Sequence, residues 1–250
     1  MIAKLPQLKK ESRAMPTNPG APHEFDEYAE SYAELLDDPF RRRFTEDPLH
    51  FHKRKWDILA DLLLSEGKDP AKTGWLDVGC GQGDLLNLGG GKFAQAAGCD
   101  PSSAMLQSAP SFEMRKQISA TKIPYANESF DLVTAVCVYH HVHGSNRDLL
   151  TKEVMRVLKP GGLCCLVEHN PWNPVTRSIV KRCPVDVDAK LITTSEARVL
   201  FRRHHFELLR TDYFLYLPES LFRRYGRWER YLRRIPFGGQ YILTMRTPLS

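Results

Sequence analysis

Hydrophobic residues along this chain follow two different periods. Through the centre, short runs of strand-like composition alternate with segments whose apolar positions recur every three or four residues. This alternation is typical of crossover units, and therefore of a parallel sheet covered by helices. The pattern predicts strands at 74–78, 96–99, 130–137, 163–168, 208–217 and 240–245, and helices at 84–93, 102–108, 147–158, 175–182, 195–204 and 219–234.

The beginning of the chain differs from this centre. Residues 1–22 are rich in proline, lysine and small polar residues without a hydrophobic period, so we expect a flexible tail. Residues 23–68 turn helical and predict an N-terminal cap, in which Tyr28, Tyr32 and Lys55 either close a ligand site or pack as ordinary helix residues. Residues 69–250 then form the main domain, with helical insertions near 171–192 and 218–235.

Composition narrows the class of protein. A chain of 250 residues with 42% hydrophobic positions can bury a sizeable core. Its apolar runs are shorter than the roughly 20 residues of a membrane-spanning helix, and residues 1–20 lack the apolar stretch of a secretory signal. The six cysteines form no Cys-x-x-Cys pair, as expected for free thiols in a reducing compartment. The sequence therefore predicts a cytoplasmic protein.

Glycines cluster where the first central strand ends. Segment 77–83 (Asp-Val-Gly-Cys-Gly-Gln-Gly) joins that strand to a helix, so the backbone must turn sharply and a ligand can approach it. A dinucleotide fingerprint needs glycine where Asp84 stands, and a P-loop needs a Gly-Lys-Ser/Thr sequence that is absent here. Asp100 closes the next strand, where a carboxylate can accept hydrogen bonds from ribose hydroxyls. Loop and acid together indicate a site for an adenosine group.

Three further segments follow this loop in an order that resembles the class I S-adenosylmethionine-dependent methyltransferases. They are Gly-Cys-Asp-Pro-Ser at 98–102, Ile-Pro-Tyr at 123–125 followed by Ser-Phe-Asp-Leu-Val at 129–133, and Val-Leu-Lys-Pro-Gly-Gly at 157–162. The resemblance implies an α/β, Rossmann-like fold: a doubly wound, mostly parallel seven-stranded sheet with an N-terminal helical cap and a C-terminal helical insertion. It also implies S-adenosyl-L-methionine as cofactor and S-adenosyl-L-homocysteine as product.

The resemblance assigns cofactor roles to individual residues. The loop glycines would cradle the methionine part, Asp77 would orient the loop or meet the amino group, and Asp100 would hold the ribose. The family's acidic adenine-binding residue corresponds to Ser119, so the serine hydroxyl or the Ala120 backbone would replace it. The cofactor-binding candidates are Asp77, Gly79, Cys80, Gly81, Gly83, Asp100, Pro101, Met105, Ser119, Ala120, Val136 and Tyr32.

Two histidines follow strand ends where a base is needed. Methyl transfer from a sulfonium requires an aligned nucleophile and, where that nucleophile carries a proton, a base. His140 follows the strand predicted at 130–137, which is the fourth strand of the family's sheet. Glu168 and His169 stand at the end of the next strand, predicted at 163–168. Both places lie at the carboxyl edge of the sheet, where ligands bind. We expect His140 or His169 as the base, with Glu168 orienting its partner. The alternative is that these side chains pack into the pocket wall.

Segment 169–184, which follows the strand predicted at 163–168, resembles a bacterial subgroup of methyltransferases of the small-molecule type. Its prolines and one tryptophan would build a rigid loop over the pocket, and simple loop packing is the alternative. The predicted acceptor contacts are His141, Tyr139, Trp172 and Asn170. The acceptor would be a metabolite with an O, N or C nucleophile, aromatic or lipid-linked. Histidines and carboxylates lack metal-ligand spacing along the chain, so the sequence predicts no metal.

The last predicted helix, 219–234, combines an apolar stripe with many arginines. The stripe consists of Leu221, Tyr225, Trp228, Leu232 and Ile235. We expect the stripe to pack on the domain while the basic face is solvated. Peripheral contact with an anionic membrane, or with an acidic or lipid-like substrate, is the alternative.

Two other functions compete with small-molecule methylation. A sequence pI of about 8.9 and the arginine-rich C-terminal third suggest an RNA methyltransferase. Amino-methylating nucleic-acid enzymes, however, carry an Asn/Asp-Pro-Pro-aromatic motif after the fourth strand, where this chain has Tyr139 and His140. A non-catalytic partner protein would be free to lose the glycine loop and Asp100, both of which are intact. Nucleic acid is therefore not an expected partner.

Overall fold

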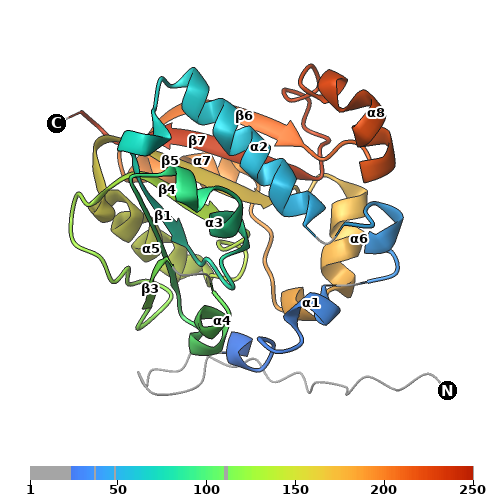
Figure 1. Cartoon of the computed structure of the whole chain (residues 1–250), viewed down its shortest axis with the longest axis horizontal. Helices are drawn as coiled ribbons and strands as arrows, with labels where there is room; N and C mark the ends of the chain where they lie inside the picture. Colours follow the sequence, from blue (N-terminus) through green and yellow to red (C-terminus); the bar gives the residue numbers. More distant parts are fainter. Residues whose placement is uncertain (1–23, 37, 48, 110–111, 250) are drawn as a thin grey trace.

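The computed structural model describes residues 24–36, 38–47, 49–109 and 112–249 (Figure 1). The strands are β1 (Gly74–Val78), β2 (Gln95–Asp100), β3 (Glu113–Lys116), β4 (Phe130–Val136), β5 (Leu158–His169), β6 (Glu207–Phe214) and β7 (Gln240–Arg246). The α-helices are α1 (Tyr32–Leu35), α2 (His50–Ser65), α3 (Asp84–Gly89), α4 (Ser103–Gln107), α5 (Gly144–Val157), α6 (Pro174–Arg182), α7 (Thr194–Arg203) and α8 (Glu219–Glu229). Short 3₁₀ helices are η1 (Glu24–Asp26), η2 (Arg41–Arg43), η3 (Pro70–Lys72), η4 (Gly90–Lys92) and η5 (Pro184–Asp186). The tail predicted at 1–22 lies outside the described residues.

The seven strands form one sheet in the order β3-β2-β1-β4-β5-β7-β6. Strands β1 to β5 pair in parallel, and β7 runs antiparallel between β5 and β6. Strand order reverses between β1 and β4, which is the switch point of a doubly wound sheet. The predicted Rossmann-like α/β fold with a mostly parallel seven-stranded sheet is confirmed.

Alternating side chains of the strands feed two hydrophobic cores, one on each face of the sheet. On one face Trp75 packs with Leu62 of α2 and Leu86 of α3. On the other face Leu76 packs with Val154 of α5, in the cluster that also holds residues of α7. Figure 1 shows α2 and α3 in front of the sheet and α5 behind it. This rigid double layer holds the strand ends that build the site.

Two local predictions differ from the structure. Helix α5 ends at Val157 as predicted, but the turn expected at 159–162 is an irregularity inside β5, where the register with β4 shifts and Gly161 has a φ of +69°. Strand β3 was absent from the predicted set, because its residues, Glu113 to Lys116, are mainly charged and mostly exposed at the sheet edge. In the described part of the chain, no helix has the length and apolar character that crossing a membrane requires.

Candidate active site

A cavity of about 320 Å³ opens at the carboxyl ends of β1, β2, β4 and β5. Its other walls come from segments that are distant in the sequence, within 25–55, 173–186 and 215–218. Ligands of open α/β sheets bind at this edge, beside the point where the strand order reverses. The cavity is therefore the candidate active site, and each predicted site residue can be judged by whether it reaches the cavity.

The glycine loop turns with backbone angles that only glycine adopts easily. Gly79, Gly81 and Gly83 have φ values of +67°, +54° and +77°. A Cβ on Gly81 would meet no atom within 4 Å, so the loop presents bare backbone to open space, whereas one on Gly79 would lie 2.5 Å from Val138. Gly79, Cys80 and Gly81 line the cavity, while Gly83 is buried at the start of α3 and does not.

Two buried carboxylates flank this loop. Asp100 accepts hydrogen bonds from the backbone N–H groups of Gly81 at 2.9 Å and Ser102 at 2.8 Å. Asp77 accepts one from the Thr134 hydroxyl at 2.5 Å. Burial raises the pKa of Asp100 to about 6 and that of Asp77 to about 7. The hydrogen bonds that the two carboxylates accept lower both pKa values, but burial outweighs them. Both side chains line the cavity, so each can accept further hydrogen bonds from a ligand.

The N-terminal cap is fastened to the loops around these carboxylates. Asp26 accepts hydrogen bonds from the Ser102 hydroxyl at 2.6 Å and the Ala104 backbone at 3.1 Å. The Gln82 side chain donates to the backbone carbonyl of Ala29 at 2.9 Å. Tyr32, half-buried on α1, lines the cavity as the cofactor prediction requires, and so does Lys55 on α2. The cap therefore forms a wall of the cavity and not a separate unit.

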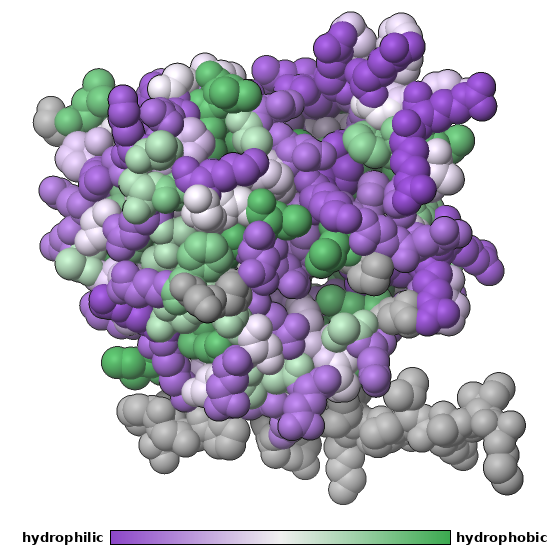
Figure 2. All heavy atoms as spheres, viewed as in Figure 1, coloured by the Kyte–Doolittle hydropathy of each residue, from purple (hydrophilic) through white to green (hydrophobic). Residues whose placement is uncertain are grey.

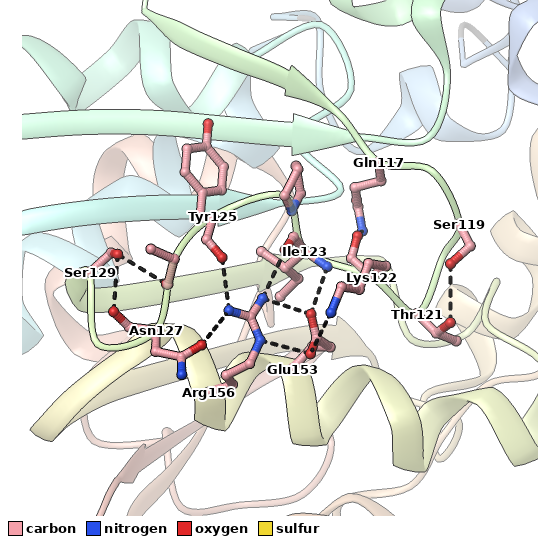
Figure 3. A network of polar contacts seen from close by, with 12 residues as sticks. Gln117, Ser119, Thr121, Lys122, Ile123, Tyr125, Asn127, Ser129, Glu153 and Arg156 are labelled. Carbon is pink, nitrogen blue, oxygen red and sulfur yellow. Dashed lines mark hydrogen bonds and ion pairs between the residues drawn. The ribbon is translucent and has the colours of Figure 1, made fainter. Parts of the chain in front are cut away.

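The loop after β3 carries the residue expected to bind adenine. Ser119 is exposed, lies outside the cavity lining, and its hydroxyl is 3.2 Å from that of Thr121 (Figure 3). Gln117 is buried and lines the cavity instead, with its amide nitrogen 3.5 Å from the Lys122 carbonyl. Gln117 therefore reaches the cavity from this loop, and Ser119 does not. The other candidates on this side, Pro101, Met105, Ala120 and Val136, all line the cavity.

Helix α5 fixes the remainder of this loop. Glu153 accepts a hydrogen bond from the Ile123 backbone at 3.1 Å, and Arg156 donates to the backbone carbonyls of Ile123 and Tyr125 at 2.8 Å each (Figure 3). A salt bridge of 2.7 Å joins the two side chains. This bracing holds the loop that follows Gln117 against the body of the domain.

The acceptor side of the cavity contains a cluster of histidines and carboxylates. His140 is buried, and its Nδ1 lies 2.5 Å from Oε2 of the fully buried Glu168. The Nε2 atoms of His140 and His141 lie 3.5 and 3.3 Å from Oδ1 of Asp186. Burial lowers the pKa of His140, but the charge of Glu168 and the close contacts with both carboxylates outweigh it and raise that pKa to about 10. Glu168 lies behind His140 and does not itself line the cavity.

His169, the second predicted base, lies beside this cluster. Its ring centroid is 5.1 Å from that of His140, and its Nδ1 is 3.3 Å from the side-chain nitrogen of Gln240. The same Gln240 nitrogen is 3.4 Å from the Cys137 sulfur, which Lys55 approaches to 3.7 Å. Burial raises the pKa of the Cys137 thiol, but the charges of Lys55 and His169 outweigh it and lower that pKa to about 7.

Sequence reasoning missed several residues of this wall, namely Gln117, Cys137, Asp186 and Gln240. Cys137 directly follows β4, in the way that Asp100 ends β2, and this position at a strand end was the available signal. It also has a φ of +58°, a strained value for a residue other than glycine. Asp186 carried no local signal, because only the fold brings η5 to the histidines.

Three of the four predicted acceptor contacts lie away from the cavity. Tyr139 is fully buried in the core, where its hydroxyl is 3.1 Å from that of Thr151. Trp172 is 67% exposed and does not line the cavity. Asn170 is buried, and its amide donates to the backbone carbonyls of residues 236 and 238, so it braces two loops. His141 alone of the four lines the cavity.

Helix α8 is held by its acidic residues and not by its apolar stripe. Glu219 accepts hydrogen bonds from the Thr45 hydroxyl at 2.8 Å and from two backbone N–H groups of the cap. Glu229 pairs with the buried Arg54 and accepts the Tyr216 backbone N–H at 2.6 Å. These buried contacts fix which face of α8 points inward.

The stripe therefore faces outward, and the expectation that it packs on the domain is wrong. Its members Leu221, Tyr225, Trp228 and Ile235 are 42% to 55% exposed. The neighbouring arginines at 223, 224, 227, 230 and 234 are also exposed. Figure 2 shows hydrophilic side chains crowded over α8 at the upper right, with paler and hydrophobic atoms between them.

Comparison with known proteins finds a family model that matches the central part of the chain. Residues 76–166 match the model of a family described as a methyltransferase domain. An uncharacterized methyltransferase, YcgJ of Bacillus subtilis, is 30% identical over 128 residues, which cover 48% of this chain and 50% of YcgJ. The ubiquinone/menaquinone biosynthesis C-methyltransferase UbiE of Desulfotalea psychrophila is 32% identical over 116 residues, which cover 44% of this chain and 46% of UbiE. The chain thus spans about half the length of these relatives.

Solved structures extend the likeness beyond the matched domain. A SAM-dependent methyltransferase from Thermotoga maritima superposes with a TM-score of 0.63 and 18% identity, covering 89% of this chain and 98% of the other. At that identity the likeness shows the fold alone. Most of the chain therefore has a fold that the Thermotoga maritima protein shares, while the chemistry of the site has to be argued from the chain's own residues.

Proposed function

We propose, from the premise that residues 76–166 form a methyltransferase domain of the S-adenosylmethionine-dependent class, that this protein methylates a small-molecule acceptor. The observation that carries the proposal is a single cavity lined both by the glycine loop with Asp100 and by the histidine cluster. A cofactor and an acceptor can therefore meet inside one cavity, which is what direct transfer between them requires.

The residues around the glycine loop fit the cofactor. Bound S-adenosylmethionine would supply an electrophilic methyl group on a cationic sulfur. The bare backbone at Gly81 leaves room for the methionine part, and Asp100 keeps lone pairs for ribose hydroxyls. Asp77, beside the loop, suits the amino group. Gln117 takes the adenine role expected of Ser119.

His169 is the base in this proposal. His140 is held between Glu168 and Asp186, so both of its ring nitrogens already face carboxylates. His169 lines the same cavity beside it, with Gln240 fixing its ring. Glu168 then acts by positioning His140 and not by touching the acceptor.

The acceptor that we propose is lipid-linked and is presented at an anionic membrane surface. Leu215, Tyr216, Leu217 and Pro218 line the cavity and lead directly into α8, whose exposed stripe lies among arginines. A helix with exposed aromatic and basic side chains is suited to the interface of an anionic bilayer. The name of the UbiE relative, which refers to ubiquinone and menaquinone, is consistent with a hydrophobic acceptor.

Radiolabelled S-adenosylmethionine tests the methyl transfer. Incubation with separated polar, lipid and RNA fractions of a bacterial extract should place label in the lipid fraction, and the Asp100→Ala variant should lose that labelling. Label in the RNA fraction would favour the nucleic-acid alternative. If S-adenosylhomocysteine fails to bind the parent protein at millimolar concentration, the proposal is wrong, because the cavity then does not take the cofactor.

Vesicle co-sedimentation tests the membrane part separately. The parent protein should bind phosphatidylglycerol vesicles at low salt, and less at high salt because the attraction is screened. Replacing Arg224 and Arg227 by glutamine should weaken binding about 30-fold, since each arginine near the surface contributes about 1 kcal/mol. The matched control replaces the exposed Arg202 and Arg203 of α7, which should leave binding unchanged. Equal loss in both variants would contradict docking through α8.

A further inference from the structure

His140, His141 and Asp186 form a cluster that the cofactor site does not require. All three line the cavity, and the two histidine Nε2 atoms and an oxygen of Asp186 lie within 4.8 Å of one another. The sequence showed no metal-ligand spacing for these residues, because the third member comes from η5, far away in the sequence. We propose that these three residues bind a divalent first-row transition metal ion, with an open coordination position toward the cavity.

The distances suit a metal better than a hydrogen-bond network. Asp186 Oδ1 lies 3.5 Å from His140 Nε2 and 3.3 Å from His141 Nε2. Two ligand atoms at the usual zinc distances of about 2.0–2.1 Å, arranged tetrahedrally, lie about 3.3–3.4 Å apart. Among the described residues, His140 Nε2 is buried and has no hydrogen-bond partner. A metal ion between the three side chains would satisfy this atom.

Glu168 supports the same arrangement from behind. Its Oε2 lies 2.5 Å from Nδ1 of His140, so the carboxylate holds the Nδ1 proton and turns Nε2 toward the cavity. A histidine that binds metal commonly has a carboxylate in this position, which fixes its tautomer and ring orientation. Glu168 itself is held by the Tyr139 backbone N–H at 2.7 Å. Glu168 does not line the cavity, so we assign it the role of orienting the His140 ring for metal binding.

The ligand set indicates the class of metal and what it does. Two imidazoles and one carboxylate suit Zn²⁺, Fe²⁺ or Mn²⁺, whereas Mg²⁺ and Ca²⁺ prefer oxygen ligands alone. Three protein ligands leave at least one position for an outside group, as in catalytic sites. Resting on the proposed function, a metal held here would leave this position to a hydroxyl oxygen of the acceptor and would lower the pKa of that hydroxyl. His169, beside His140 in the same cavity, would then accept the hydroxyl proton.

Direct metal binding tests the proposal without any assay of activity. Metal-free protein should bind one Zn²⁺ per chain in calorimetry and show no heat with Mg²⁺. Asp186→Asn and His141→Ala should each weaken zinc binding at least 100-fold, and Glu168→Gln about 10- to 100-fold. Both Asp186 and His141 are only partly buried, so these two variants should keep the fold, which circular dichroism checks.

Two controls guard against zinc held elsewhere. His204→Ala removes a partly buried histidine that lies 3.1 Å from Asp148 outside the cavity, and Cys137→Ser removes the cavity-lining thiol whose pKa is lowered. Both should keep the full affinity, and the cobalt-substituted protein should show no thiolate-to-cobalt charge-transfer band. Absence of zinc binding, or equal zinc affinity in the parent and Asp186→Asn, would overturn the metal site. The two histidines and Asp186 would then share a proton and not a metal ion. Zinc binding without methyl transfer would support the site while removing the proposed function.

Discussion

The two halves of the cavity are built in different ways. The half around Gly81 and Asp100 comes from two consecutive strand-to-helix loops, and backbone conformation together with two short side chains defines it. The half around His140 is assembled from β4, β5, η5 and the segment before α8. The cofactor half can therefore persist as a local motif, whereas the acceptor half changes whenever any one of four segments changes.

The largest expected effect concerns the anchor of the acceptor half. Glu229→Ala removes the buried partner of Arg54, which keeps the largely exposed Asp57 at 3.5 Å, and it frees the Tyr216 backbone N–H, so we expect about 3–5 kcal/mol of lost stability. Urea unfolding measures this loss. The control is Arg227→Ala at an exposed position, whose free energy of unfolding should stay within about 0.5 kcal/mol of the parent's. In the fraction that stays folded, affinity for S-adenosylhomocysteine should be unchanged. A parallel loss of affinity would show that the two halves are not independent.

A change in the cofactor half should have the opposite signature. Asp100→Ala removes a charged acceptor and should weaken S-adenosylhomocysteine binding by about 1.5–3 kcal/mol, measured by calorimetry. Zinc affinity of the same variant should equal that of the parent, because the carboxylate belongs to the other half. Unchanged cofactor affinity would contradict the assignment of Asp100 to the ribose.

The pH dependence of stability follows from Asp77. Its pKa in the folded protein is about 7, above the usual 3.8, so between these values the folded state binds more protons than the unfolded chain. The free energy of unfolding of the ligand-free protein should therefore fall as pH rises through this window, with at most about 1.4 kcal/mol per pH unit coming from Asp77. Asp100, whose pKa is raised to about 6, adds a slope of the same sign below that pH. Asp77→Asn should flatten this slope in urea titrations at pH 5 and pH 8. An unaltered slope would assign it to another group.

The smallest effect distinguishes two neighbouring residues of the adenine side. Gln117→Ala should cost about 0.5–1.5 kcal/mol of cofactor affinity, the range of a neutral hydrogen bond. Ser119→Ala should cost nothing measurable, because that hydroxyl is exposed and meets Thr121. The reverse result would restore the adenine role first expected of Ser119.

The comparison explains which parts of the site could be predicted. The loop with Gly79 to Gly83 and the acid at Asp100 are neighbours in sequence and in space, so a pattern along the chain locates both. Asp186 reaches His141 only through the fold, and no local spacing records that contact. In α8 the stripe obeyed helical periodicity, but buried ion pairs through Glu219 and Glu229 decided the inward face. Periodicity identifies an amphipathic helix without saying which face the domain covers.

The position of β7 has a consequence for how the protein is made. This strand follows all the other described strands in the chain, yet it lies between β5 and β6. Among the described strands, β6 pairs with β7 alone. While the ribosome still holds residues 240–246, the edge of β5 stays open and β6 has no place to attach. Gln240, the first residue of β7, also meets His169 in the cavity. The acceptor wall is therefore among the last parts of the molecule to form during synthesis, and a nascent chain that stalls before β7 exposes a long, apolar strand edge to its neighbours.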